Sequence, residues 1–323
     1  RRMVALTAAL LALIVLTGAA VRLTEAGLGC SDWPNCHEGE LLPEQEDLLG
    51  LIEYGNRLLS GVVGLATLAT AVLAHRLQPR RPDLVPWAWG LVAGSAAQVL
   101  LGMAVVQLEL DPIAVAGHFL LSMVMLWNVV VLWLLSGSAP GTAVTPRFDP
   151  GTINHGRVML AFISLVVLVG TMVTGTGPNS GDSRAERLGF EFTTIARTHS
   201  LLAWAFGISA LTLAVRLNRS AVAALGPPNG NPSRRARLLV YASVAQGAIG
   251  YWQYLTGVPP LLVEVHVFGS VVLWVLSLLT YFALFARRGA DQVDNVSVDR
   301  LPLVGSDHSD TSFASRRRPA TER

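Results

Sequence analysis

The chain has 323 residues, of which 52% are hydrophobic and only 14% are charged. Its mean hydropathy is +0.49. Soluble domains usually carry about 25% charged residues, so this composition excludes an ordinary soluble protein and indicates a membrane protein. A formal net charge of +2 gives no case for nucleic-acid binding, and two cysteines are too few for a multi-cysteine zinc or iron–sulfur framework.

Apolar runs long enough to cross about 30 Å of hydrocarbon occur eight times along the chain. They cover residues 3–21, 58–74, 84–108, 113–135, 158–176, 198–215, 238–258 and 265–286. Backbone groups in lipid must be hydrogen-bonded within the segment, so each run is expected to be a helix. The second helix is expected to begin nearer Tyr54, which places Arg57 inside it. The sequence therefore predicts an all-α polytopic membrane protein with eight transmembrane helices.

The distribution of arginine predicts the orientation. Arginines gather at the N-terminus and in the connections near 76–81, 147–157 and 216–237, which all lie on one side of the membrane. The loop 23–52 on the other side is rich in acidic residues. The excess of arginine marks the cytoplasmic side, so both termini are expected in the cytoplasm and the 23–52 loop outside. The polar tail 289–323 is expected to be disordered.

Cys30 and Cys36 lie in this outer loop, within the segment Gly-Leu-Gly-Cys-Ser-Asp-Trp-Pro-Asn-Cys. Outside the cytoplasm a nearby pair of thiols tends to oxidise. Three interpretations remain open from the residues alone: a small structural disulfide, a redox-active pair, and two thiols that stay reduced.

An internal repeat divides the chain into two parallel four-helix halves, residues 1–140 and 141–288. Gln98 and His118 in the first half are echoed by Gln246 and His266 in the second, and each residue lies 148 positions from its counterpart. Four helices per repeat cross the membrane an even number of times, so the halves run in the same direction. The outer loop of the first half is longer than its counterpart, so beyond that loop equivalent residues of the two halves lie 143 positions apart. This spacing pairs Asn56 with His199.

Three histidines, His118, His199 and His266, lie just inside the outer ends of their spans and so share one depth. An ionisable side chain inside a membrane is costly and usually faces a functional interior. Two imidazoles from facing helices suit the axial positions of a heme iron, whereas zinc would require a third or fourth ligand that the sequence does not offer. The pair His199 and His266 is therefore predicted to hold a heme in the second half.

The first half adds a carboxylate that the second half lacks. Glu53 precedes Asn56 by three residues and Arg57 by four, so the three share one helical face, and the counterpart of Glu53 is Ala196. Glu53 is either an interfacial partner of Arg57 or a chemical group beside an open heme.

These features together resemble the heme A synthase family. They are the eight spans in two repeats, the Cys-bearing outer loop, the segment Glu53-Tyr-Gly-Asn56-Arg57 and the outer-side histidines, and the resemblance runs from about residue 3 to residue 288. It implies a bacterial plasma-membrane oxidoreductase that converts the C8 methyl group of heme O to the formyl group of heme A by successive hydroxylations, with oxygen from water. It also implies contacts with membrane lipid and, as candidate partners, heme O synthase, assembly factors of the terminal oxidase and a second copy of the chain.

The resemblance also assigns roles to the residues. His199 and His266 would ligate a resident heme b, His118 would ligate the substrate heme, and Glu53 would be the catalytic carboxylate. Arg57 would pair with Glu53 or with a heme propionate, and Cys30 and Cys36 would form a disulfide. Many family members carry histidine at the position of Asn56. The substrate heme would therefore be bound through His118 alone, or with a water molecule held by Asn56 and Glu53.

Two other functions account for the histidines. A di-heme b-type cytochrome that exchanges electrons with quinone would use them as ligands, but it explains neither Glu53 nor the Cys loop. A transporter built from parallel repeats would use them as a proton relay, and it predicts helices broken near the membrane midplane.

Overall fold

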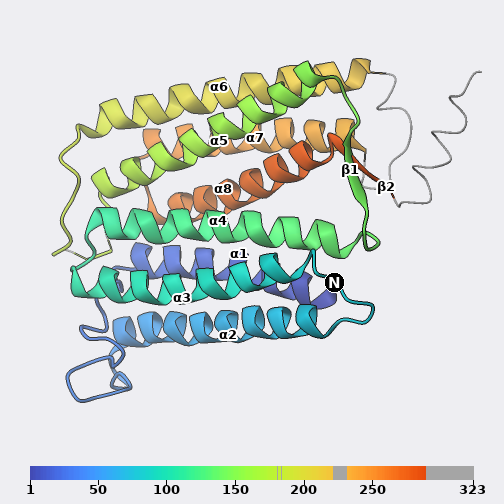
Figure 1. Cartoon of the computed structure of the whole chain (residues 1–323). Helices are drawn as coiled ribbons and strands as arrows, with labels where there is room; N and C mark the ends of the chain where they lie inside the picture. The colour runs from blue at the N-terminus through green and yellow to red at the C-terminus, as the bar shows by residue number, and fades with distance from the viewer. Residues whose placement is uncertain (180, 183, 221–230, 289–323) are drawn as a thin grey trace, which may run out of the picture.

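The computed structural model describes residues 1–179, 181–182, 184–220 and 231–288, and in this part of the chain eight long helices run side by side (Figure 1). The helices are α1 (Arg2–Leu23), α2 (Leu48–Arg76), α3 (Val85–Gln107), α4 (Pro112–Ser136), α5 (Pro150–Thr176), α6 (Phe192–Arg219), α7 (Pro232–Leu255) and α8 (Pro260–Phe282). The predicted all-α polytopic fold is confirmed. The predicted disordered tail, 289–323, lies outside the described residues.

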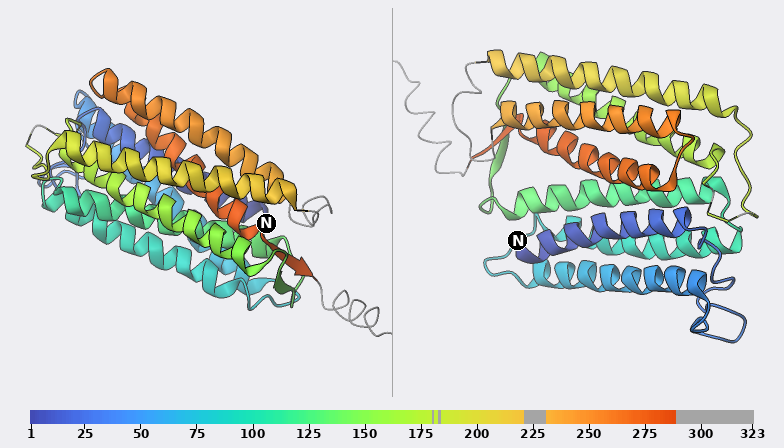
Figure 2. Two further views of the ribbon diagram at one scale, coloured as in Figure 1. Left: turned by 90° about the horizontal axis from the view of Figure 1, so that it is seen from above. Right: turned by 180° about the vertical axis from the view of Figure 1, so that it is seen from behind.

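Seven of the helices are long and apolar enough to cross a membrane, and α7 is not among them. Helix α7 contains the predicted run from residue 238 up to Leu255, but three arginines stand in its first two turns and two glutamines follow further along. It nevertheless packs between α6 and α8 and runs alongside them (Figure 2).

Several helices begin earlier than their apolar runs, because polar residues cap them. Helix α2 starts at Leu48, where the side chain of Asp47 accepts a hydrogen bond from the backbone N–H of Gly50 at 2.9 Å. Asp111, Asp149, Glu191 and Asn231 cap α4, α5, α6 and α7 in the same way. Such caps satisfy backbone donors that a hydrophobic pattern does not reveal. The early start of α2 places Glu53 well inside a helix.

The cap of α6 also changes the pKa of the capping residue, Glu191. Hydrogen bonds from Thr194 and Thr193 lower the pKa of Glu191 from 4.5 to about 2. Its carboxylate accepts from the backbone N–H groups of the same two threonines at 2.5 and 2.9 Å. Glu191 therefore stays ionised and fixes the start of the helix that carries His199.

The order of packing in α1–α4 is repeated in α5–α8. Within each set, consecutive helices are in contact and the first also contacts the fourth, while α1 with α8, α4 with α5 and α4 with α8 join the two sets. One apolar core lies mainly among α1–α4 and includes Leu91 and Leu132, and a second lies among α5–α8 and includes Met159 and Leu213. This pattern is what a duplicated four-helix unit would produce.

A short antiparallel sheet, not expected from the sequence, joins the two sets at the end of the bundle where the N-terminus lies (Figure 1). Strand β1 (Ala143–Pro146) follows α4 and pairs with β2 (Phe285–Arg288), which follows α8. The Cys-bearing loop lies at the opposite end of the bundle from this sheet and the N-terminus (Figure 1).

Candidate functional site

One large cavity of about 1720 Å³ lies among the helices, and all six site residues expected inside the helices line it. They are Glu53, Asn56, Arg57, His118, His199 and His266. The other walls are mostly apolar side chains from both sets of four helices. A pocket for one drug-sized ligand usually has about 300–1,000 Å³, so this cavity has room for more than one such group.

His199 of α6 and His266 of α8 face each other within this cavity. Their ring centres are 6.3 Å apart and their ring planes are inclined by 60°. Metal–imidazole bonds of about 2 Å place two ring centres about 6 Å apart when both rings bind one ion from opposite sides. The pair therefore has the spacing of two axial ligands of one metal.

Two glycines make room for these rings. A Cβ atom added to Gly170 of α5 would lie 3.1 Å from Cε1 of His199, and one added to Gly250 of α7 would lie 3.0 Å from Cε1 of His266. Both distances are closer than ordinary carbon–carbon contact. Each imidazole thus lies directly against the backbone of the neighbouring helix, which holds the ring toward the cavity.

The first set of helices repeats this arrangement with an amide in place of one ring. A Cβ on Gly102 of α3 would lie 3.6 Å from Cε1 of His118, and one on Gly18 of α1 would lie 3.9 Å from Nδ2 of Asn56. Oδ1 of Asn56 accepts a hydrogen bond from Thr17 at 2.7 Å. That bond orients the amide, so that its NH₂ group lies on the side of Gly18, another residue that lines the cavity.

Two glutamines at equivalent positions brace the histidine helices. Gln98 donates to the backbone carbonyl of His118 at 3.0 Å, and Gln246 donates to that of His266 at 2.8 Å. The repeat in the sequence thus corresponds to a repeated contact, which fixes the height at which each histidine enters the cavity.

The histidine side chains have unmet hydrogen-bonding capacity. The Nδ1 atoms of His118, His199 and His266 are buried, and none makes a hydrogen bond of normal geometry, although the backbone of Val166 interacts with His199. Nδ1 of His199 and Nδ1 of His266 lie 3.4 and 3.5 Å from the place that a Cβ on Gly170 and on Gly250 would take, so this nitrogen faces the neighbouring helix and Nε2 is the ring atom left to bind a partner in the cavity. In the described part of the chain, no group of three or more His, Cys, Asp or Glu side chains could hold a metal ion. A heme iron needs only axial ligands from the protein, and it fits the paired imidazoles and the apolar walls.

Glu53 is buried, with 6% of its surface exposed, and it joins α2 to the outer loop. Its Oε2 accepts a hydrogen bond from the backbone N–H of Cys30 at 2.7 Å, and its Oε1 accepts from Nη2 of Arg57 at 2.6 Å and from Nε at 3.2 Å. The sequence left two roles open for Glu53: an interfacial partner of Arg57, or a chemical group beside an open heme. The structure shows the pairing with Arg57, but in a buried position on the wall of the cavity.

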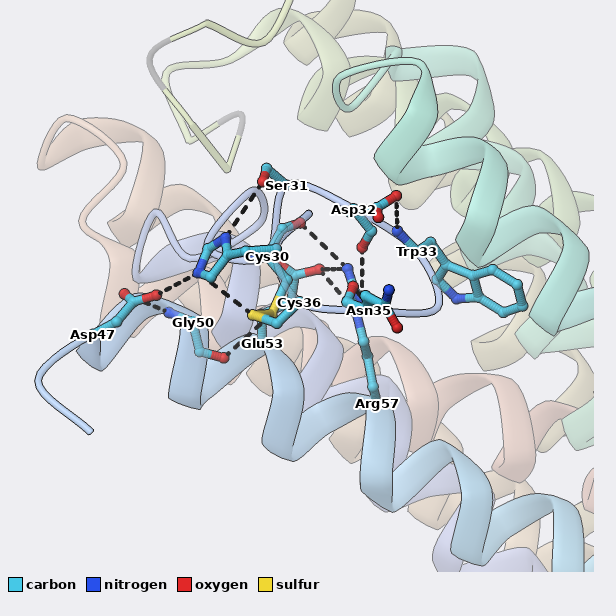
Figure 3. The surroundings of a disulfide bond; sticks show 11 residues. Cys30, Ser31, Asp32, Trp33, Asn35, Cys36, Asp47, Gly50, Glu53 and Arg57 are labelled. Carbon is cyan, nitrogen blue, oxygen red and sulfur yellow. Dashed lines mark hydrogen bonds and ion pairs between the residues drawn. A yellow bond between two sulfur atoms is a disulfide. The ribbon is translucent and has the colours of Figure 1, made fainter. Parts of the chain in front are cut away.

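Arg57 extends the same network into the loop (Figure 3). Its guanidinium donates to the backbone carbonyls of Asp32, Asn35 and Cys30 at 2.8, 2.9 and 3.3 Å. The loop is thereby held on the end of α2, and Trp33, which follows Asp32, reaches the cavity wall.

Cys30 and Cys36 form a disulfide, as the resemblance implied. His37, which the sequence gave no reason to single out, lies beside it. Its Nε2 is 3.8 Å from Sγ of Cys36 and 3.2 Å from a carboxylate oxygen of Asp47 (Figure 3). The backbone N–H of Gly50 lowers the pKa of Asp47, and the hydrogen bond from His37 lowers it further. Disulfide and helix cap are thus joined through one imidazole.

Comparison with known proteins gives the family. The family model described as cytochrome oxidase assembly protein matches residues 1–178, more than half of the chain. The chain belongs to this family. It is 30% identical over 168 residues to a heme A synthase of an Exiguobacterium species, which is 51% of this chain and 54% of that relative. It is also 30% identical over 166 residues to the heme A synthase of Lysinibacillus sphaericus, with 51% and 52% covered. The heme A synthase of Shewanella oneidensis is 30% identical over 179 residues, with 50% and 52% covered.

The alignments therefore span about half the length of these relatives. The part that matches the family model contains the Cys loop, Glu53, Asn56, Arg57 and His118. His199 and His266 lie beyond it, so the reasons to group them with the first-half residues are the internal repeat and the shared cavity.

Proposed function

We propose that the chain is a heme A synthase, an oxidoreductase that converts the C8 methyl group of heme O to the formyl group of heme A. The observation that carries the proposal is the shared cavity, which is lined by two facing imidazoles from the second half and by a third imidazole and a buried carboxylate from the first. The family and the names of the relatives point the same way. The alternatives from the sequence are a di-heme cytochrome and a transporter, and neither gives a role to a carboxylate fixed in the cavity wall.

In the second half, His199 and His266 would hold a heme b. Bound there, heme b would supply one-electron transfer. The residues of the chain set its position: Gly170 and Gly250 let the two rings approach, and Gln246 sets the height of His266. The iron would bind the Nε2 atoms, because the Nδ1 atoms of both rings face the neighbouring helices.

In the first half, His118 would bind the iron of the substrate heme O. Conversion of a methyl group to a formyl group with water as the oxygen source consumes one water and releases four protons and four electrons. Each hydroxylation therefore needs a group that accepts a proton and an acceptor that removes electrons. Glu53, one helical turn from Asn56 on α2, is our candidate base; Glu186, which also lines the cavity, lies in the connection between α5 and α6.

The hydrogen bonds of Glu53 leave it one site for this task. An ionised carboxylate has roughly four lone-pair sites, two on each oxygen. Arg57 fills both sites on Oε1, and the N–H of Cys30 fills one on Oε2. The remaining site on Oε2 would accept a proton from water, and the NH₂ group of Asn56 would help to orient that water.

The proposal extends to location and partners. The protein would be a multi-pass protein of the bacterial cell membrane with both termini in the cytoplasm and the Cys loop outside. Residues 1–140 would form the substrate half and residues 141–288 the heme b half. Heme O synthase would supply the substrate, and assembly factors of the terminal oxidase would receive the product.

Co-expression with a heme O synthase, followed by heme extraction and chromatography, tests the proposal. We expect heme b and heme A in the purified wild-type protein. His199→Ala and His266→Ala should lose heme b, while His75→Ala, which alters an exposed histidine outside the cavity, should retain it. Bound heme b without any conversion of heme O would favour the di-heme cytochrome, and protein without heme would favour the transporter.

A further inference from the structure

The second half carries a polar bridge between α6 and α7 that the first half lacks. The hydroxyl group of Tyr251 on α7 accepts a hydrogen bond from Nε1 of Trp204 at 3.0 Å and bonds to Oγ of Ser200 at 2.8 Å. Ser200 and Trp204 belong to α6. We call these three residues the α6–α7 bridge.

The bridge lies beside the paired histidines and at the boundary of the cavity. Ser200 directly follows His199, and Tyr251 directly follows Gly250, the glycine that makes room for His266. All three bridge residues line the cavity, yet Trp204 is 59% exposed and Tyr251 48% exposed. They therefore close the cavity toward the lipid-facing surface of the bundle.

The equivalent positions in the first half carry Arg57, Gly61 and Met103, by the offsets of 143 and 148. Arg57 points into the Cys loop, where it is hydrogen-bonded. At Gly61 no atom lies within 4 Å of the place that a Cβ would take, and the same holds for Gly64 one turn further on. Both glycines line the cavity, but Gly207, the counterpart of Gly64, has the same open space, so the halves differ at Gly61, where the second half has Trp204.

Side chains of α2 and α3 do meet, but deeper in the bundle. Thr67 and Ser95 hydrogen-bond through their hydroxyl groups at 3.1 Å, nearly two turns beyond Gly61. Near Gly61 the cavity is lined from α2 and α3 by Gly64, Leu68 and Val99, together with the polar Ser60 and Gln98, so a mainly apolar surface is available to a hydrocarbon chain.

We propose that this difference separates an exchangeable heme site from a permanent one. Substrate heme O enters and product leaves the first half sideways from the lipid, between α2 and α3, and the prenyl chain of the heme lies in the gap beside Gly61 and Gly64. The α6–α7 bridge blocks the corresponding path in the second half and so retains heme b. This inference rests on the proposed function, since it assumes a heme in each half.

The rate at which the purified protein loses heme b to an excess of apomyoglobin in detergent tests the retaining role of the bridge. Tyr251→Phe removes both hydrogen bonds and keeps the ring, so the fold should be preserved. We expect heme b to leave about threefold to tenfold faster than from the wild type. Trp252→Phe is the matched control, because Trp252 is an exposed aromatic residue of the same helix outside the cavity wall, and its rate should equal that of the wild type.

Transfer of the bridge to the first half tests the entry route. Gly61→Trp with Met103→Tyr should lower the uptake of added heme O about tenfold or more and leave the heme b content unchanged. Gly55→Trp, at an exposed glycine of α2 outside the cavity, should leave uptake unchanged. Equal heme b loss from Tyr251→Phe and wild type, or normal heme O uptake by the double variant, would overturn this inference alone. A wild-type protein that binds no heme b would instead overturn the proposed function.

Discussion

Replacement of Glu53 by glutamine affects both the contact of this residue with the Cys loop and its proposed role as a base. The carboxylate accepts three hydrogen bonds, one from the Cys loop and two from Arg57, and it lines the cavity. Glutamine keeps the shape but removes the negative charge, and its NH₂ group cannot accept hydrogen bonds. The substitution therefore weakens the attachment of the loop and removes the proposed base in one step.

The structural part of the loss can be bounded. Loss of one member of a buried ion pair typically costs about 3–5 kcal/mol because the other charge is left unpaired. The guanidinium of Arg57 keeps its three backbone carbonyl acceptors, so we expect a smaller cost of about 1–3 kcal/mol in the free energy of unfolding. The chemical part is larger, since loss of a general base lowers the rate about 10²- to 10⁴-fold, equivalent to about 3–5 kcal/mol in activation free energy.

Arg57→Gln is the comparison that tells the two parts apart. It breaks the same ion pair and loosens the same loop but leaves the carboxylate in place. At matched amounts of folded, heme b-containing protein, Glu53→Gln should accumulate heme O or a hydroxylated intermediate, whereas Arg57→Gln should still make heme A, at a rate reduced no more than about tenfold. Equal losses of heme A in the two variants, or normal heme A production by Glu53→Gln, would refute the catalytic role and leave Glu53 as an anchor of the loop.

Three further predictions follow from the structure. Gly250→Ala should displace the imidazole of His266 by a few tenths of an ångström and perturb the low-spin heme spectrum. Gly102→Ala, where a Cβ would lie 3.6 Å from His118, should leave the protein and its heme b spectrum unchanged. Identical spectra for the two variants would contradict the close contact between Gly250 and His266. Mass spectrometry without reduction should show Cys30 and Cys36 linked, and free thiols in protein purified without reductant would contradict this. Glu191→Gln should lower the Tm at pH 7, because the pKa of Glu191 is lower in the folded than in the unfolded chain and its ionised form therefore stabilises the fold at pH values above 4.5. The difference in Tm from wild type should vanish as the pH falls from 4.5 toward 2. A difference that does not depend on pH would show that the charge of Glu191 contributes nothing to stability.

The sequence was sufficient for the helices because the apolar runs and the cost of unpaired backbone in lipid leave little choice. It placed the start of α2 too late, since Asp47 caps the helix ahead of the apolar run and a polar stretch with Glu53 continues it. It also missed β1 and β2, whose pairing joins residues about 140 positions apart and leaves no local pattern. Short strands of this kind are defined by the partner rather than by their own sequence.

At the site, the repeat was the informative signal. The repeat relates His118 to His266 in the sequence, and both residues line the same cavity in the structure. The glycines belong to the same repeat, but their contact with the imidazoles depends on how closely the helices approach, which spacing does not show. Likewise the adjacency of His37 to Cys36 was visible, but its bond to Asp47 arises only when the loop folds back on the helix cap.

Two differences between the halves, at Asn56 and at Gly61, lie toward the end of the bundle that carries the Cys loop, and both bear on the proposed heme sites. Asn56 stands where the second half has His199, so under the proposed function one side of the substrate heme would be left to a smaller group. Gly61 stands where the second half has Trp204, and under the proposed lateral route this would leave the first half open toward the lipid. A permanent electron carrier needs two strong ligands and a closed pocket, whereas a substrate heme needs a free face and a way out. Because neither requirement can be met without relaxing the other, two copies of one four-helix unit, modified in opposite directions, would provide both proposed sites within a single cavity.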